Sequence, residues 1–177
     1  MKSLLLFTSL TLTFLAAPLA SAGDNLLKNP ELKQAEEGKT PSGWKTYGNK
    51  QKLSTDEKEA PKGSEQSLRV DIVADGGKSL GQVVQKIPVK AKTDYILKLD
   101  MKSSTSGLGL GQIKLMSARS ELQRIPTEKS STKWSTIELA FNSGNADNIL
   151  VLLRFKQKAE HNGETVWFAN PVLIEKH

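Results

Sequence analysis

Several charged and amide side chains of this 177-residue chain fall at every second position of segments that alternate polar with apolar residues. Such positions share one face of a β-strand. Guanidinium, carboxylate and amide groups on one face can bind hydroxyls or acidic groups of a ligand. The residues of this kind are Arg69, Asp71, Lys98, Asp100, Gln112, Lys114 and Arg154. The alternative is a solvated face whose opposite charges only pair across strands.

The sequence contains little evidence for a catalytic site or a zinc site. Imidazole comes only from His161 and His177, one in an Asn-Gly turn and one at the terminus, and there is no thiol. No Gly-x-Ser-x-Gly motif marks a nucleophile. Gly107 to Gly111 lacks the strand-to-helix context of a phosphate loop and more simply indicates close approach of neighbouring chain. We predict no catalytic residues and a protein that is not an enzyme.

The first 22 residues resemble an export signal. Lys2 provides a positive charge, an apolar run follows from Leu4 to Leu15, and Ala20-Ser21-Ala22 fits a cleavage site. This run is too short to span a bilayer comfortably. We predict cleavage near Ala22, a secreted or periplasmic location, and one domain over residues 23–177, with no transmembrane segment in it.

Composition narrows the choice of partners. The formal net charge is +6, and there is no cysteine, so core packing alone must stabilise the fold. A mild positive excess suits acidic polysaccharides or a cell envelope, although it also serves ordinary solubility. No basic stripe is interleaved with aromatic residues, so nucleic acid is not an expected partner.

Hydrophobic alternation predicts an all-β fold. One face of each segment is apolar in Ser67 to Ile72, Thr93 to Lys102 and Trp134 to Phe141. Ile149 to Phe155 is more continuously apolar, with apolar residues at every position from Ile149 to Leu153, which is typical of a central strand covered on much of both faces. Shorter strands are expected at Leu80 to Ile87, Leu108 to Met116 and Thr165 to Glu175, and Asp56 to Lys62 has room for one short helix. Eight or nine strands of this kind predict an antiparallel two-sheet sandwich or jelly roll.

Six segments in order resemble the carbohydrate-binding modules appended to bacterial cellulases and xylanases. The segments are Asn25 to Pro30, Pro41 to Trp44, Ser67 to Val70, Thr93 to Leu97, Ser131 to Trp134 and Val166 to Asn170. The resemblance covers nearly the whole of residues 23–177. It implies a galactose-binding-like jelly roll that holds an oligosaccharide on a concave sheet without catalysis.

The resemblance also assigns roles to aromatic residues. Trp44, Tyr95 and Trp134 match core and turn positions, and Trp167 is expected to pack in the core as well. An outward aromatic on the strand after the conserved Tyr is replaced by Asp100. Tyr47 is the remaining candidate for stacking on a sugar, and a single platform predicts shallow binding.

Similar modules hold a structural calcium ion, but two of its expected ligand positions are Lys33 and Ala169 here. Neither side chain can ligate calcium, which binds oxygen. Asp24 and Glu31 are weak substitutes, so we expect no cofactor.

The leading hypothesis is an exported, non-catalytic module that binds a poly- or oligosaccharide reversibly, acting alone or with another exported protein. The rival uses the same fold to contact a protein or the cell envelope. A glycoside hydrolase or lyase component is the third alternative.

The missing calcium ligands give a direct test. We expect the melting temperature to be unchanged by EDTA, because no metal contributes to the folded state. A fall that added calcium reverses would contradict this expectation.

Overall fold

The computed structural model describes residues 23–34, 36–48, 51–73, 80–105, 110–118, 120–125 and 131–176. The predicted signal segment 1–22, the predicted turn at 74–77, Gly107 to Gly109 and His177 lie outside them. Within the described ranges the chain forms ten strands and one short 3-10 helix, η2 (Ala159–His161).

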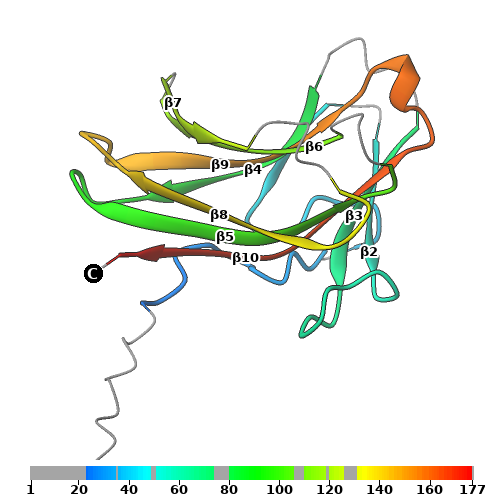
Figure 1. Ribbon diagram of the computed structural model, residues 1–177, viewed down its shortest axis with the longest axis horizontal. Helices are drawn as coiled ribbons and strands as arrows, with labels where there is room; N and C mark the ends of the chain where they lie inside the picture. The colour runs from blue at the N-terminus through cyan, green and yellow to red at the C-terminus, as the bar shows by residue number, and fades with distance from the viewer. Residues whose placement is uncertain are drawn as a thin grey trace, which may run out of the picture.

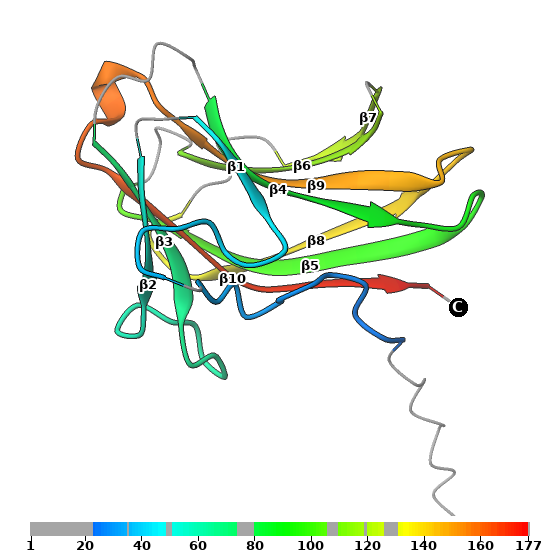
Figure 2. The same cartoon turned by 180° about the vertical axis from the view of Figure 1, so that it is seen from behind.

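Two five-stranded antiparallel sheets face each other as a sandwich (Figure 1). Sheet A contains, in spatial order, β1 (Lys45–Tyr47), β4 (Leu80–Pro88), β9 (Asn148–Lys156), β6 (Gly111–Ser117) and β7 (Ser120–Arg124). Sheet B contains β2 (Gln51–Asp56), β3 (Ser67–Ile72), β10 (Thr165–Glu175), β5 (Asp94–Ser103) and β8 (Ser135–Asn142). At the edge of sheet A, β7 bends away from the sandwich (Figures 1 and 2).

The predicted all-β sandwich is confirmed. The alternating and continuous apolar segments all form strands, and the short strands β1, β2 and β7 were not predicted. The helix allowed for Asp56 to Lys62 was wrong, because β2 ends at Asp56 and bends and turns follow it. Pro61 lacks the backbone N–H that a helix interior needs.

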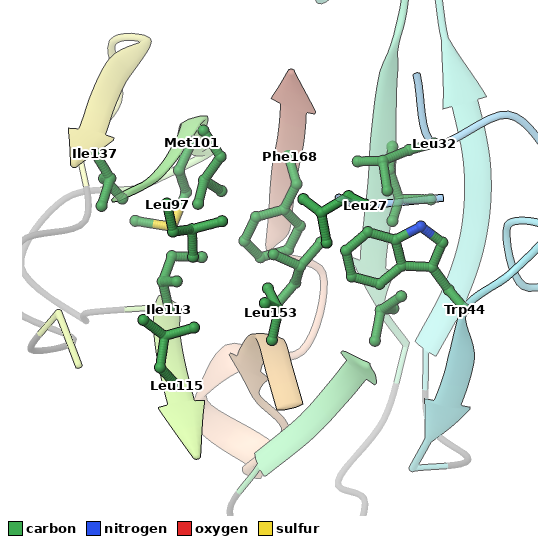
Figure 3. Close-up of a cluster of buried hydrophobic side chains, with 14 of the residues drawn as sticks. Leu27, Leu32, Trp44, Leu97, Met101, Ile113, Leu115, Ile137, Leu153 and Phe168 are labelled. Carbon is green, nitrogen blue, oxygen red and sulfur yellow. The ribbon is translucent and has the colours of Figure 1, made fainter. Parts of the chain in front are cut away.

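The core lies between the sheets and takes alternate side chains from the longer strands. Leu97, Leu99 and Met101 of β5 are at most 1% exposed. Figure 3 shows Phe168 and Leu153 in the middle of this cluster, with Trp44 to one side. Trp44 and Tyr95 are core residues as predicted, whereas Trp134 is only half-buried.

Two glycines of sheet A leave room for buried side chains of the core. Phe155 of β9 pairs in register with Gly81 of β4 and with Gly111 of β6. A Cβ on Gly81 would lie 2.3 Å from the Phe155 ring, and one on Gly111 would lie 2.5 Å from Sδ of Met101. Gly111 therefore allows the close approach expected from its glycine-rich segment.

The N-terminal segment is fastened to the last strand. The Asn25 amide donates to the Pro171 carbonyl at 3.0 Å, and its oxygen accepts from the Leu173 N–H at 2.9 Å. Figure 2 shows this segment running beside β10. Buried Gln85 likewise accepts from the N–H of Lys28 and donates to its carbonyl, at 2.7 and 2.9 Å. Asn25 and Gln85 therefore hold the first described segment against both sheets.

The close contact at Gly81 predicts that Gly81→Ala destabilises the fold by about 1–3 kcal/mol, the usual cost of overpacking. Urea unfolding monitored by tryptophan fluorescence measures the change. Gly23→Ala is the control, because a Cβ there meets its nearest atom at 3.8 Å. Equal midpoints for the two variants would contradict the packing argument.

His161 predicts a pH-dependent stability. Its side chain is 1% exposed, and Nδ1 has no hydrogen-bond partner. Burial lowers the pKa of His161 below its ordinary 6.5, although Glu160 opposes the shift. The unfolded chain therefore takes up a proton near pH 6.5 that the folded chain resists. Stability from this group is complete above that pH and is lost as pH falls towards the lower folded pKa.

We expect the melting temperature to fall between about pH 8 and pH 5, and His161→Gln to flatten that fall. Asp56, whose pKa is held below 3.8, stays ionised across this window. His177→Gln is the matched control and is expected to keep the wild-type pH profile. An unchanged profile in His161→Gln would show that other groups cause the dependence.

Candidate functional site

One register row crosses four adjacent strands on the outer face of sheet A. Tyr47 of β1 pairs with Gln82 of β4, Gln82 pairs with Arg154 of β9, and Arg154 pairs with Gln112 of β6. Strand alternation turns all four side chains away from the core, because their neighbours Val83, Leu153 and Ile113 fill it. We call these four residues the Tyr47 row. It brings together an aromatic ring, two amides and a guanidinium group.

Arg154 is the central charge of the Tyr47 row. Its Nη1 donates to Oε1 of Gln112 at 2.7 Å, while its Nε is buried without a hydrogen-bond partner. Among the described residues Arg154 makes no ion pair. Burial lowers the pKa of Arg154, and Arg124 adds to this effect while Glu121 opposes it. The guanidinium is therefore a strong donor whose hydrogen-bonding capacity the protein only partly uses.

Apolar side chains occupy the next row on the same face. Val84 and Leu152 pair in register and are 7% and 4% exposed, and Leu152 also pairs with Lys114. Tyr47, by contrast, is 54% exposed at the edge of the sheet. The face thus combines an exposed aromatic ring, polar groups and a largely buried apolar strip, which is the usual composition of a ligand surface.

The other predicted candidates lie on the opposite side of the molecule. Arg69 and Asp71 belong to β3, and Lys98 and Asp100 belong to β5, both in sheet B. The eight residues therefore do not share one face. Four of them, Tyr47, Gln112, Lys114 and Arg154, lie on sheet A.

Charges on the outer face of sheet B are largely paired with one another. Arg69 contacts Asp71 at 2.9 Å and Asp56 at 3.4 Å. Lys98 contacts Glu138 at 2.9 Å. Asp100 accepts from Thr136 at 2.6 Å and from the amide of Asn170 at 2.8 Å. These contacts match the alternative of a solvated face with cross-strand pairing.

Trp167 is buried, as predicted, but it lies on this outer face and outside the cluster between the two sheets. It pairs in register with Arg69 and Lys102, whose charges lie 5.7 and 5.1 Å from its ring. Its indole N–H donates to Asp56 at 3.0 Å. Burial raises the pKa of Asp56, but this bond and three others outweigh it and lower the pKa overall. The ring is 7% exposed and is closed to a ligand in this arrangement.

The weak calcium candidates do not come together as a metal site. Glu31 and Lys33 line an open pocket of about 360 Å³ beside Asn170 and the loop at Gly63 to Gln66. Asp24 is not part of that lining. No group of three or more His, Cys, Asp or Glu within the described ranges could hold a metal ion. Ala169 is buried in β10 and offers no side-chain oxygen.

Sequence reasoning did not name Gln82. Its place in the alternating segment Leu80 to Ile87, between Gly81 and Val83, was the available signal, because it puts the amide on the outer face. No helix in the described part of the chain is long and apolar enough to cross a membrane.

Solved structures that share this fold include a cyclase and carbohydrate-binding modules. A Stig cyclase from Fischerella sp. TAU, in complex with an indole compound, is 14% identical with a TM-score of 0.69, over 88% of this chain and 98% of that one. TmCBM61 in complex with β-1,4-galactotriose is 15% identical with a TM-score of 0.62, over 86% and 99%. A family 16 carbohydrate binding module is 17% identical with a TM-score of 0.52, over 70% and 85%. At these identities the likeness shows the fold alone.

No curated protein matches the chain. The family described as "Carbohydrate binding domain" matches residues 24–160, which is most of the chain and includes nine of the ten strands. This match agrees with the resemblance found in the six sequence segments and with the jelly-roll neighbours. The chain therefore belongs to the carbohydrate binding domain family.

Proposed function

We propose that this protein binds a saccharide reversibly on the outer face of sheet A, through the Tyr47 row. The observation that carries the proposal is the register alignment of Tyr47, Gln82, Arg154 and Gln112 across four strands. Family membership supports a saccharide as the ligand class.

The Tyr47 row has the groups that a sugar ring requires. A half-exposed aromatic ring can cover the apolar face of a sugar, while amide and guanidinium groups bond its hydroxyls. Adjacent strands in a sheet are about 4.8 Å apart, so four strands span roughly 14 Å, enough for about three sugar units. A saccharide chain would lie across the strands and start at the exposed Tyr47, whereas Gln112 at the far end is 5% exposed and holds Arg154 through its side-chain oxygen.

Sheet B is the less suitable face. A ligand there would have to break the ion pairs of Arg69 and Lys98, and it would have to displace Arg69 and Lys102 to reach Trp167. Such an exchange replaces satisfied contacts instead of adding new ones. On sheet A the ring of Tyr47 is exposed, and Arg154 makes no ion pair among the described residues, so a ligand there breaks no such pair.

The small number of carboxylates in the strands of sheet A supports binding without catalysis. Glycoside hydrolysis ordinarily needs two carboxyl groups across the scissile bond. In the five strands of sheet A Glu121 is the single acidic residue, and it contacts Lys114 at 2.9 Å and Arg124 at 2.6 Å. We also propose export of the protein after removal of residues 1–22.

Affinity electrophoresis tests the proposed face. We expect retarded migration in native gels that contain at least one of xylan, mixed-linkage glucan, pectin or alginate. Tyr47→Ala is expected to weaken that binding roughly three- to tenfold, the effect of losing one stacking contact. Gln82→Ala is expected to weaken it less, because one neutral hydrogen bond is lost.

Lys98→Ala and Asp100→Ala on sheet B are the matched controls and are expected to migrate as the wild type does. If these controls lose binding while Tyr47→Ala keeps it, the site lies on sheet B and the proposed face is contradicted. Normal migration of the wild type in every gel would favour the rival role, contact with a protein or the cell envelope. Release of reducing sugar would contradict the non-catalytic part of the proposal.

A further inference from the structure

Charge is divided unequally between the two sheets. The five strands of sheet A contain six cationic residues and one carboxylate. Those of sheet B contain four cationic residues and six carboxylates. The strands of sheet A thus carry an excess of five positive charges, and those of sheet B an excess of two negative charges. Among the strand residues, the positive charge is therefore concentrated on the sheet of the proposed ligand face.

Register places the cations of sheet A around the Tyr47 row. Lys45 pairs with Val84, Lys114 pairs with Leu152 and with Arg124, and Lys86 pairs with Leu150. These residues flank Arg154 in the next two rows of the same face. Lys45 and Lys86 are exposed and make no ion pair within the part of the chain that the structure describes. Their charges are therefore available to a ligand.

Among the residues that the structure describes, Arg154 has no counterion. The nearest available carboxylate on its sheet, Glu121, is held by Lys114 and Arg124. The guanidinium is half-buried in the central strand, its Nε lacks a partner, and only Nη1 has an acceptor. A buried cation without a counterion is unfavourable unless a ligand supplies the negative charge. This arrangement is the opposite of sheet B, where Arg69 contacts two carboxylates.

We infer that the saccharide recognised by the Tyr47 row contains uronic acid residues, and that Arg154 binds their carboxylate. A planar guanidinium matches a carboxylate with two parallel hydrogen bonds, which favours a carboxylate over a hydroxyl. Lys45, Lys86 and Lys114 add a positive field that attracts successive acidic units of the polymer. This inference rests on the proposed function and specifies the chemical class of its ligand.

The test compares uronate polymers with forms that differ only in the acid group. Polygalacturonate, alginate and glucuronoxylan are each used as such and after reduction of the carboxylate to a hydroxymethyl group. We expect at least one polymer to bind the full chain in about 0.15 M salt, and its reduced form to bind about tenfold more weakly or less. Dextran sulfate tests whether a sulfate group is bound in place of a carboxylate, and neutral dextran is its control.

Two variants remove one positive charge each. Arg154→Gln is expected to weaken uronate binding about tenfold. Lys62→Gln, in the exposed loop between β2 and β3, is expected to change it less than about twofold. Arg154→Lys keeps the charge but not the planar fork, and is expected to recover only part of the loss. Circular dichroism and melting temperature establish that each variant is folded.

The outcomes separate the two proposals. Equal affinity for a uronate polymer and its reduced form would overturn the uronate assignment and leave saccharide binding in place. Binding to none of the acidic or neutral polymers would overturn the proposed function itself. Equal losses in Arg154→Gln and Lys62→Gln would show attraction by net charge alone and overturn the role of Arg154. If dextran sulfate binds more tightly than the uronate polymers, and if that binding depends on Arg154, the recognised group is a sulfate ester and not a carboxylate.

Discussion

Alternation along each strand is the constraint on which the structure depends. A strand that buries one side chain must turn the next one outward, so the core of the sandwich dictates what lies on its two outer faces. Burial of Leu153 and Phe155 leaves Arg154 on the outside, and burial of Ile113 leaves Gln112 and Lys114 there. The Tyr47 row is thus positioned by the hydrophobic core, and it needs no additional scaffold of its own.

The same constraint explains how much of the fold could be predicted. Period-two patterns identified the strands and the inward faces of β3, β5 and β8, because those signals are local. Sheet membership is not local. Asp100 and Gln112 are close in sequence, yet β5 pairs with β8 and β10 while β6 pairs with β7 and β9. A single shared face for all eight candidates could not be tested without knowing that pairing. The short strands β1 and β7 lacked enough apolar residues to give a pattern.

Trp167 shows that the size of an aromatic ring predicts its burial but not the face on which it is buried. A large ring is usually buried in a core, but Val166 and Phe168 are both inward and fully buried, so Trp167 between them must face outward. Strict alternation therefore contained the correct answer. The ring is buried nonetheless, because Arg69 and Lys102 cover its two sides and Asp56 accepts its N–H. Sheet B uses its charges to close an aromatic surface that would otherwise resemble a sugar platform.

The two faces thus treat charge in opposite ways, and the contrast bears on function. On sheet B, Arg69 has two carboxylate partners. On sheet A, Lys114 and Arg124 each contact one oxygen of Glu121, and Arg154 has no carboxylate partner among the described residues. A stability-driven sequence would place an acid or an apolar residue near Arg154, because a half-buried unpaired cation lowers stability. A loss of stability at one position is typical of a binding site, where the ligand supplies the missing contact and stabilises the folded state by an amount that rises with the logarithm of its concentration. An Arg154 without a carboxylate partner among the described residues, in the same register row as an exposed Tyr47, therefore supports the proposed ligand face.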